Sequence, residues 1–360
     1  MQYCSKCVTP ASRPRIEFDK YGICMACRWH EKKQISIDWE KRKELFVALC
    51  DKHRHDGDWN CIVPVSGGKD GSYVAWTIKH QFGMNPLCVT FAPQMQTRLG
   101  QRNLENFRQS GFDHLLITPE VNAYKRYARD WFIKYGFPKQ PFVVGISTSI
   151  LRLAKAMGVR LIIWGEQGEQ EYTGNTNTFG VEQFNRDFLI RCYYEGQENS
   201  AKYGPWWHVP EQKNLDDLYS TWWSLYEDWD PDEHARIAKE KTGLELMVGG
   251  SIGTFTNASQ LDDILQDLHC YLMFLKYGFG RCTSDASIEI RRGRMTRAQG
   301  VEIVNKLDGT FPLEYLSAYL DYFEMTGIEF EAIINKFANK DLLMKTDNPT
   351  RPWILKESAK

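Results

Sequence analysis

The chain has 360 residues, a length typical of two globular units rather than one small domain or a multi-enzyme chain. Hydrophobic residues make up 42% and charged residues 25%, values that exclude wholesale disorder and fibrous structure. The 45 basic and 46 acidic side chains give a net charge of −1, so the chain lacks the basic excess of a dedicated nucleic-acid binder.

The beginning of the sequence shows no targeting signal. Residues 1–7 lack the apolar stretch of a signal peptide, and no apolar run approaches the roughly 18 residues that a membrane helix needs. We therefore expect a cytoplasmic protein without membrane insertion, in which the ten cysteines stay reduced.

Four cysteines form two Cys-x2-Cys pairs, and 16 residues separate the pairs. Two such turns can complete a tetrahedral four-sulfur zinc site, whereas a redox dithiol expects one pair beside a βαβ unit. The sequence therefore predicts structural zinc in a ribbon over residues 1–35. The predicted zinc ligands are Cys4, Cys7, Cys24 and Cys27. The other cysteines, expected to be small buried hydrophobes, are Cys50, Cys61, Cys88, Cys192, Cys270 and Cys282.

A glycine-rich loop follows a short apolar stretch at residues 60–65 and precedes apolar positions at helical spacing over 73–79. The order strand, glycine turn, helix directs free backbone N–H groups and the positive helix end at one point, which suits phosphate. The loop matches neither the Walker motif nor a G-x-G-x-x-G dinucleotide motif. The plainer alternative is an ordinary turn in which Asp70 caps the helix. The loop reads Ser66, Gly67, Gly68, Lys69, Asp70, Gly71, Ser72.

The Ser-Gly-Gly-x-Asp form resembles the pyrophosphate-binding loop of the ATP pyrophosphatase (PP-loop) superfamily. That resemblance implies cleavage of ATP between its α and β phosphates, with adenylation of a substrate oxygen. Asp70 would then face Mg²⁺, because bound pyrophosphate needs a divalent cation to offset its charge. The superfamily loop normally runs Asp-Ser, whereas Gly71 here precedes Ser72, the candidate for the loop hydroxyl.

The segments after the loop alternate between strand and helix, which predicts a doubly wound parallel sheet. Strands are expected over 86–92, 114–118 and 160–164, and helices over 99–110, 123–135 and 145–157. Ligands of such sheets bind at the carboxyl ends of the strands. Thr90, Phe91, Gly165 and Glu166 therefore share a rim with the loop, and Glu166 is a candidate for metal or substrate contact. A solvated turn glutamate is the alternative.

The remaining segments divide the chain further. One bridging amphipathic helix is expected over 35–54, more helices follow from 261, and the tail after 347 is expected to be a surface extension. Two glycines at 277–281 suggest a functional turn. Four arginines at 291, 292, 294 and 297 suit phosphates or a sugar carboxylate, with a solvated helix face as the alternative. The tryptophans at 206, 207, 222, 223 and 229 suit sugar stacking or a partner surface, although burial is the commoner explanation.

These segments define five predicted units: the ribbon 1–35, a connecting helix 36–58, the PP-loop domain 59–185, an aromatic-rich substrate region 186–260 and a helical region 261–360.

Taken together, the sequence is similar to the N-acetyl sugar amidotransferase family of bacterial surface-polysaccharide and flagellar-sugar biosynthesis. The stretches that carry this resemblance are Tyr3–Cys7, Cys24–Arg28, Ile62–Asp70, Leu99–Asn106, Leu161–Glu166, Phe274–Arg281 and Ile288–Arg297. The resemblance thus spans nearly the whole chain and is weakest over residues 170–260.

The resemblance implies ATP-dependent conversion of a sugar acetamido group to an acetamidino group. An O-adenylyl imidate forms first, and ammonia then displaces AMP. The implied cofactors are structural Zn²⁺ and Mg²⁺, with ATP as co-substrate. The implied partners are a nucleotide-sugar substrate, a separate glutaminase subunit and a cyclase-like barrel subunit that supply ammonia, and no nucleic acid.

The resemblance also assigns candidate site residues. The implied catalytic residues are Asp70, Lys69 and Glu166. The implied ATP- and pyrophosphate-binding residues are Ser66, Gly67, Gly68, Lys69, Asp70, Gly71, Ser72, Thr90, Phe91 and Gly165. The implied substrate-binding residues are Arg102, Asn103, Tyr277, Arg281, Arg291 and Arg292.

Two other functions remain open at this stage. A tRNA-thiolating enzyme can also join zinc cysteines to this loop, and it predicts RNA binding and a sulfur-carrying Cys192 or Cys282. The neutral net charge counts against it. A nucleotide-sensing scaffold without catalytic activity is the third hypothesis.

Overall fold

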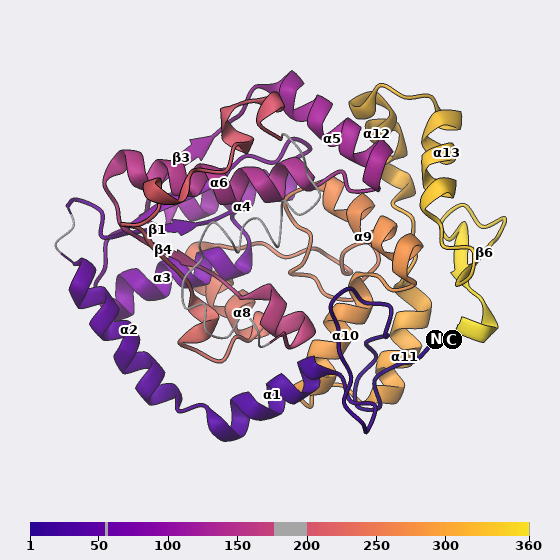
Figure 1. Cartoon of the computed structure of the whole chain (residues 1–360), viewed down its shortest axis with the longest axis horizontal. Helices are drawn as coiled ribbons and strands as arrows, with labels where there is room; N and C mark the ends of the chain where they lie inside the picture. The colour runs from indigo at the N-terminus through magenta and orange to yellow at the C-terminus, as the bar shows by residue number, and fades with distance from the viewer. Residues whose placement is uncertain (55–56, 176–199, 360) are drawn as a thin grey trace.

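A five-stranded parallel sheet in the order β3-β2-β1-β4-β5 forms the centre of the computed structural model (Figure 1). The structure describes residues 1–54, 57–175 and 200–359. The predicted α/β class with a parallel sheet is confirmed. The strand order reverses between β1 and β4, and such a switch point opens a crevice at the carboxyl ends of the two strands. The strands are β1 Cys61–Pro64, β2 Pro86–Phe91, β3 Asp113–Ile117, β4 Leu161–Trp164 and β5 Tyr219–Trp222.

Both faces of the sheet are covered because alternate strand residues point to opposite sides. Ile62 and Ile162 pack with α5 and α6, whereas Val63 and Ile163 pack with α2 and α3. These residues are almost fully buried, as central parallel strands require. The helices on the two faces are α2 Trp39–His53, α3 Lys69–Phe82, α4 Arg98–Gln109, α5 Val121–Tyr135 and α6 Gln140–Met157. The predicted strands and helices of this part of the chain are confirmed, and α6 begins five residues earlier than expected.

The bridging segment differs from the single helix expected over 35–54. It forms two helices, α1 Met25–Ser36 and α2, because the chain leaves the helical conformation at Ile37 and restarts at Asp38. The Asp38 side chain accepts a hydrogen bond from the Lys41 amide and so caps α2. Helix α1 thereby belongs to the ribbon, whose last cysteine lies within it.

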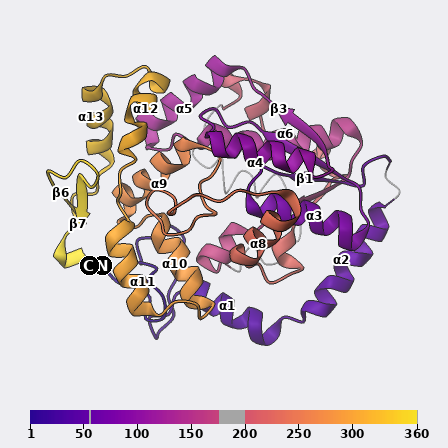
Figure 2. The ribbon, with the colours of Figure 1, turned by 180° about the vertical axis from the view of Figure 1, so that it is seen from behind.

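The region 186–260, expected to form a substrate region, also contributes to the sheet. It supplies β5, which pairs in parallel with β4, and helix α8 Pro231–Thr242, which packs on α3 (Figure 2). Sequence patterns missed β5 because its four residues, Tyr219–Trp222, are too short and too aromatic to show a period. Of its tryptophans, 207, 222, 223 and 229 are buried, so the simpler explanation of the tryptophan cluster holds for them.

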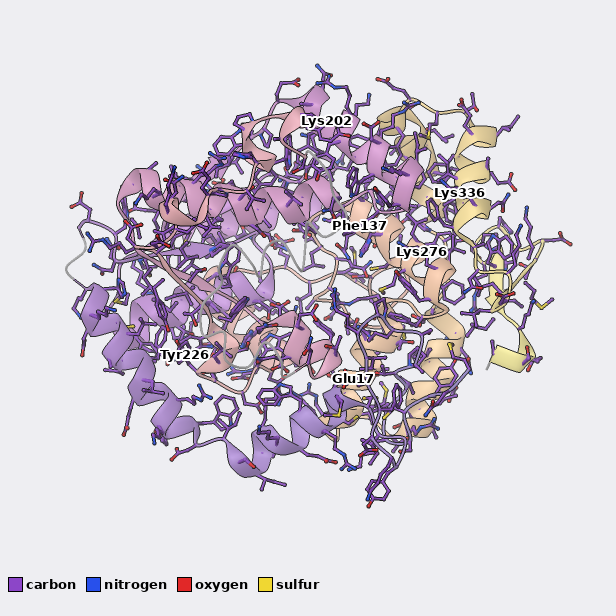
Figure 3. The ribbon with its side chains drawn as sticks, in the orientation of Figure 1. Glu17, Phe137, Lys202, Tyr226, Lys276 and Lys336 are labelled. Atoms are coloured by element: carbon purple, nitrogen blue, oxygen red, sulfur yellow. The ribbon has the colours of Figure 1, made fainter. Side chains whose placement is uncertain are left out.

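The carboxyl-terminal region is helical, as predicted. Its elements are α9 Ile264–Tyr277, α10 Arg281–Arg291, α11 Arg297–Leu307, α12 Leu316–Phe323, α13 Gly327–Phe337, β6 Leu343–Lys345 and β7 Trp353–Leu355. The region packs on α5, and near Phe137 the Lys276 ammonium donates to the Gly136 carbonyl at 3.1 Å (Figure 3). Among the described residues, the short irregular helices are Glu169–Thr173, Ser200–Tyr203, Pro205–Trp207, Gln212–Asn214, Trp223–Leu225, Leu313–Tyr315 and Glu357–Ala359.

The expected surface extension after residue 347 is wrong. Strand β7 pairs antiparallel with β6, and Trp353 is buried in the helical core. The two ends of the chain lie side by side (Figure 1), where the Tyr3 hydroxyl donates to the Ala359 carbonyl at 3.0 Å. Among the described helices, none combines the length and the apolar character needed to cross a bilayer.

Candidate functional site

The four amino-terminal cysteines meet at one point. Their sulfur atoms lie within 4.8 Å of one another, with Cys4 and Cys27 3.9 Å apart and Cys7 and Cys24 3.7 Å apart. Tetrahedral zinc with Zn–S bonds of about 2.3 Å places its sulfurs about 3.8 Å apart. All four thiols are buried, so the donor set and its spacing fit a zinc ion.

The backbone around the cluster supports the same assignment. The amides of Lys6, Cys7 and Cys24 approach the Cys4 sulfur at 3.3–3.4 Å, and such donors stabilise a thiolate ligand. The Arg297 guanidinium contacts the carbonyl oxygens of Cys4 and Cys7. The ribbon is therefore tied to helix α11 through its own backbone.

The second site begins at the glycine loop, where two glycines are required by their surroundings. Gly67 has φ +82°, and a Cβ there would lie 2.7 Å from the Leu104 amide nitrogen. A Cβ at Gly71 would lie 2.8 Å from the Pro64 carbonyl oxygen, because the first turn of α3 packs on the end of β1. Gly71 departs from the superfamily pattern, and this close contact is the physical reason for it.

Helix α3 begins inside the loop, with Gly68 at its N-cap and Lys69 at its first position. The plainer alternative, in which Asp70 caps the helix, is wrong, since Gly68 is the N-cap and Asp70 lies in the first turn. Gly68 offers no side-chain acceptor, so the first amides of α3 remain available to an anion. Gly165 at the end of β4 lies close to Asp70, where an added Cβ would be 3.3 Å from the Asp70 Cβ.

A cavity of about 380 Å³ lies at the carboxyl ends of β1 and β4, between the loop and the carboxyl-terminal region. The loop, Glu166 at the end of β4, and Arg281 with the segment 258–266 all contribute to its lining. The residues that line it include Ser66, Gly68, Lys69, Asp70, Gly71, Lys139, Phe142, Ile146, Trp164, Gly165, Glu166, Ser259, Gln260 and Arg281.

The Asp70 carboxylate accepts hydrogen bonds from three side chains. Its Oδ2 accepts from Lys69 Nζ at 2.8 Å, and its Oδ1 accepts from Trp229 Nε1 and His234 Nδ1, each at 2.9 Å. Burial favours the protonated acid, but Lys69 and His234 outweigh it and hold the pKa of Asp70 well below its ordinary value. Asp70 is therefore an anion at neutral pH.

Glu166 lines the same cavity, but its pKa is shifted in the opposite direction from that of Asp70. Burial, and then the neighbouring Asp70 carboxylate, raise the pKa of Glu166 to about 7. Two carboxylates and one lysine near the N-terminus of α3 can hold a divalent cation together with a polyphosphate. A displaced pKa of this kind is typical of functional sites.

Other predicted nucleotide-binding residues lie behind the cavity rather than in it. Ser72 and Phe91 are buried and do not line the cavity, and the Ser72 hydroxyl has no hydrogen-bond partner among the described residues. The Thr90 hydroxyl donates to the Val65 carbonyl at 2.6 Å and so holds the end of β1. Ser66 lines the cavity, which makes it the better candidate for a loop hydroxyl.

The predicted substrate-binding residues separate into two groups. Arg281 lines the cavity, where its guanidinium pairs with Asp285 at 2.9 Å and donates to Ser259 at 3.0 Å. Arg102 and Asn103 do not line it, because both side chains donate hydrogen bonds to Glu245. Arg102 donates to the Glu245 carboxylate, and Asn103 donates to the Glu245 carbonyl oxygen.

Tyr277 also lies outside the cavity, at the corner between α9 and α10. Gly278 ends α9, and Gly280 begins α10 with its amide donating to Asp308 at 2.8 Å. The two glycines of the expected functional turn therefore form a helix-to-helix corner that presents Arg281 to the cavity.

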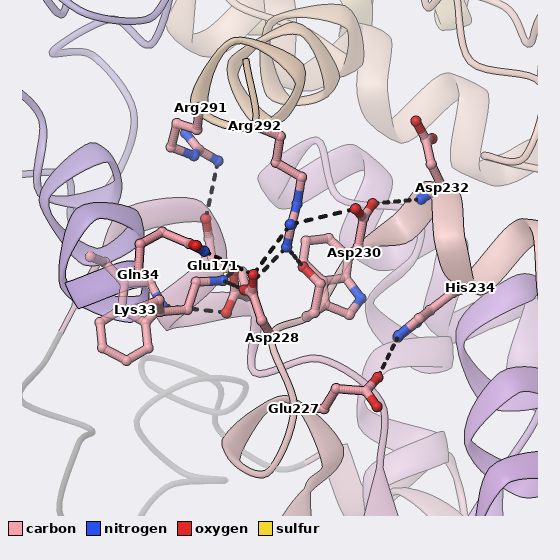
Figure 4. A network of polar contacts seen from close by, with 12 residues as sticks. Lys33, Gln34, Glu171, Glu227, Asp228, Asp230, Asp232, His234, Arg291 and Arg292 are labelled. Atoms are coloured by element: carbon pink, nitrogen blue, oxygen red, sulfur yellow. Dashed lines mark hydrogen bonds and ion pairs between the residues drawn. The ribbon is translucent and has the colours of Figure 1, made fainter. Parts of the chain in front are cut away.

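Arg291 and Arg292 belong to an ion-pair network that joins three parts of the molecule (Figure 4). Arg292 pairs with Asp228 at 3.1 Å and Asp230 at 3.4 Å, and Arg291 donates to the Glu171 carbonyl at 3.2 Å. Neither arginine lines the cavity, and Arg291 Nη1 is buried without a hydrogen-bond partner among the described residues.

His234 and Trp229 are the site residues that sequence reasoning missed. Both come from the region of weakest resemblance, and both reach Asp70 only because α8 packs on α3. Burial disfavours a charged His234, but its contacts with Asp70 and Glu227 raise its pKa. Nothing in the sequence near either residue signals this contact.

Comparisons with known proteins found one family model and one curated relative. Residues 251–360 match the family model "LPS biosynthesis protein WbpG-like, C-terminal domain". An uncharacterized protein of Methanocaldococcus jannaschii is 26% identical over 165 residues, which are 46% of this chain and 58% of that protein. The chain therefore spans a little over half the length of this curated relative.

Two solved structures share a distant likeness. A predicted subunit of tRNA methyltransferase from Methanocaldococcus jannaschii has a TM-score of 0.30 and 15% identity, over 59% of this chain and 86% of its own. NMN synthetase from Francisella tularensis has a TM-score of 0.28 and 10% identity, over 60% of this chain and 100% of its own. Scores this low carry no functional argument.

The matched segment 251–360 contains Ser259, Gln260 and Arg281, which line the cavity together with the loop. The family domain and the loop thus build one site. Residues 251–360 are thus similar to the C-terminal domain of WbpG-like lipopolysaccharide biosynthesis proteins, which agrees with the resemblance to the N-acetyl sugar amidotransferase family.

Proposed function

We propose that the chain is an ATP-dependent amidotransferase that converts the acetamido group of a nucleotide sugar to an acetamidino group. The observation that carries the proposal is the cavity of about 380 Å³ between the glycine loop and the WbpG-like domain. One wall suits a polyphosphate, and the other belongs to a domain of lipopolysaccharide biosynthesis proteins. A sugar held against that second wall would lie beside the phosphates.

The chemistry requires activation of a poor electrophile. The acetamido oxygen attacks the α-phosphorus of ATP, the amide proton leaves, and the products are an O-adenylyl imidate and pyrophosphate. Ammonia then adds to the imidate carbon, AMP departs with the former amide oxygen, and an amidine remains. Such catalysis consists mainly of positioning and neutralisation of phosphate charge.

The residues of the cavity match these two requirements. The first amides of α3 and Lys69 would hold the leaving pyrophosphate. Asp70 and Glu166 would hold Mg²⁺, which would offset the charge of the triphosphate. Arg281 would orient a phosphate of the nucleotide sugar or of ATP by its forked guanidinium.

Ammonia supply is part of the proposal. The chain would work in the cytoplasm with a separate glutaminase and a cyclase-like barrel subunit, while free ammonium salts would replace both partners in the test tube. The thiolation alternative is disfavoured by Cys282, because burial raises the pKa of its thiol and the residue does not line the cavity. Cys192, the other thiol named for that reaction, lies outside the described residues.

The test incubates the chain with ATP, Mg²⁺, ammonium chloride and a panel of di-N-acetylated nucleotide sugars. We expect AMP, pyrophosphate and a product about one mass unit lighter than the sugar, since NH replaces O. Reactions without ammonium, and reactions of an Asp70→Asn variant, serve as controls. AMP formation with tRNA and none with any sugar would overturn the proposal, and glutamine alone should yield no amidine.

A further inference from the structure

The Asp70 carboxylate is held from outside the loop by one short segment, residues 227–234, which follows β5 and includes the first turn of α8. Trp229 Nε1 and His234 Nδ1 both donate to Oδ1 at 2.9 Å. Only Oδ2 turns to Lys69, at 2.8 Å. The two oxygens of this carboxylate therefore have different surroundings, and Oδ1 has two fixed donors.

The His234 ring is fixed in its orientation by a second set of contacts. It stacks on Tyr73 with ring centroids 3.9 Å apart and an angle of 17° between the rings, and its side chain is only 1% exposed. Its Nε2 lies 3.8 Å from Glu227 Oε1. Glu227 in turn accepts from the Tyr73 hydroxyl at 2.7 Å and from Trp223 Nε1 at 3.1 Å. Since an ionised carboxylate only accepts hydrogen bonds, Nδ1 carries the proton that faces Asp70.

Ion pairs hold the segment 227–234 to helix α1 and to the arginines at the end of α10 (Figure 4). Asp228 pairs with Lys33 of α1 at 2.9 Å and with Arg292 of α10 at 3.1 Å. Asp230 pairs with Arg294 at 2.8 Å. The contacts of Trp229 and His234 with Asp70 are thus fixed by the ribbon helix and by the WbpG-like domain, not by the loop.

We propose that His234 is a positioning residue for the adenylation step, which holds the Asp70 carboxylate so that Oδ2 faces the metal and phosphates. The inference rests on the proposed function. Without the donor at Nδ1, the carboxylate gains rotational freedom and Oδ2 loses its fixed place next to Lys69. A misplacement of about 1 Å can cost about 100-fold in rate, although no bond to the substrate is lost. Trp229 has the same role through its single N–H group.

A matched pair of variants separates positioning from packing. In His234→Asn the side-chain amide keeps a donor near the place of Nδ1, whereas His234→Leu fills the site without a donor. In the pyrophosphate-release assay we expect His234→Leu to lower kcat about 100-fold and to change KM for ATP less than about threefold. His234→Asn should recover most of the loss. His80→Asn, an exposed histidine at the far end of α3, is the control for the substitution itself.

A binding measurement makes the outcome independent of the sugar reaction. ATP binding is measured by calorimetric titration with and without Mg²⁺. We expect Mg²⁺ to strengthen ATP binding to the wild type and to His234→Asn, and to strengthen it less for His234→Leu. Wild type that binds MgATP but modifies no sugar would overturn the proposed function and leave this comparison in place.

Several results would overturn the inference. They are an unchanged kcat and Mg²⁺ effect in His234→Leu, equal impairment of both His234 variants, or no Mg²⁺-dependent ATP binding by the wild type. If His234→Leu fails to fold, Trp229→Phe removes the other donor at little change of shape, and it should lower kcat about tenfold. An unchanged kcat in a folded Trp229→Phe would then contradict positioning.

Discussion

The zinc cluster and the loop cavity differ in how the chain brings their residues together. All four candidate zinc ligands lie within residues 4–27, and the turns between them are local. The cavity instead collects residues from the loop, from the end of β4, from α6 and from the segment 258–281. The first site follows from sequence spacing, whereas the second requires the whole fold. The variants that follow test how far that difference extends.

The largest effect is expected for Cys24→Ser. Cys24 is both a sulfur ligand and the N-cap residue of α1, so its loss removes the metal and loosens the helix that carries Lys33. We expect a loss of zinc and of at least about 5 kcal/mol in the free energy of unfolding, since structural zinc contributes more than that in small zinc domains. Zinc content and denaturant unfolding measure both.

The control for that variant is Cys61→Ala, which removes a buried core thiol outside the cluster. It should keep zinc and lose about 1 kcal/mol, the amount typical of a small core truncation. If Cys24→Ser kept its stability without zinc, the cluster would be four ordinary thiols. If chelation also weakened ATP binding, the two sites would be coupled through Lys33 and Asp228.

The next effect concerns Asp70. From the sequence, a loop carboxylate is expected to add little to the core, but Asp70 accepts from Lys69, Trp229 and His234. Asp70→Ala would leave those donors unpaired, so Asp70→Asn is the better variant because it keeps the shape. We expect adenylation to fall at least about 1000-fold, or about 4 kcal/mol, since the charge that faces the metal is lost.

AMP formation and thermal unfolding should be measured side by side. A fall in activity at nearly unchanged melting temperature supports the assignment. Full AMP formation by Asp70→Asn would show that the metal is held elsewhere, and Glu166→Gln would then be the variant to examine.

The extent of prediction from sequence follows the same division. The strands around β1 and β2, the helix after the loop and the cysteine pairs could be predicted because each has a local period or spacing. Strand β5 could not, since four residues with two aromatic ends carry no period. His234 could not either, because its contact with Asp70 spans 164 positions and depends on α8 packing against α3. Arg102 and Arg281 looked alike in sequence, and only the fold distinguishes them.

An intermediate effect is expected at Gly71, where the local motif meets the tertiary fold. An added methyl group would lie 2.8 Å from the Pro64 carbonyl oxygen, and this backbone cannot move without shifting β1. Gly71→Ala should therefore cost about 1–3 kcal/mol of unfolding free energy, as overpacking does. Gly327→Ala is the matched control, because nothing lies within 4 Å of its added Cβ in the first turn of α13. Equal stability of the two variants would show that the loop relaxes freely.

The smallest effect separates two arginines that the family resemblance treats alike. Arg281 lines the cavity and pairs with buried Asp285, whereas Arg102 makes an exposed pair with Glu245. Arg281→Lys keeps the charge beside Asp285 but loses the planar fork that matches a phosphate, so KM for ATP or the nucleotide sugar should rise about tenfold. Arg102→Lys should change KM less than about twofold, because exposed pairs contribute little. Steady-state kinetics with each substrate varied in turn reveals which one Arg281 contacts. A larger effect at Arg102 than at Arg281 would place the sugar outside the cavity, beside the Arg102–Glu245 pair.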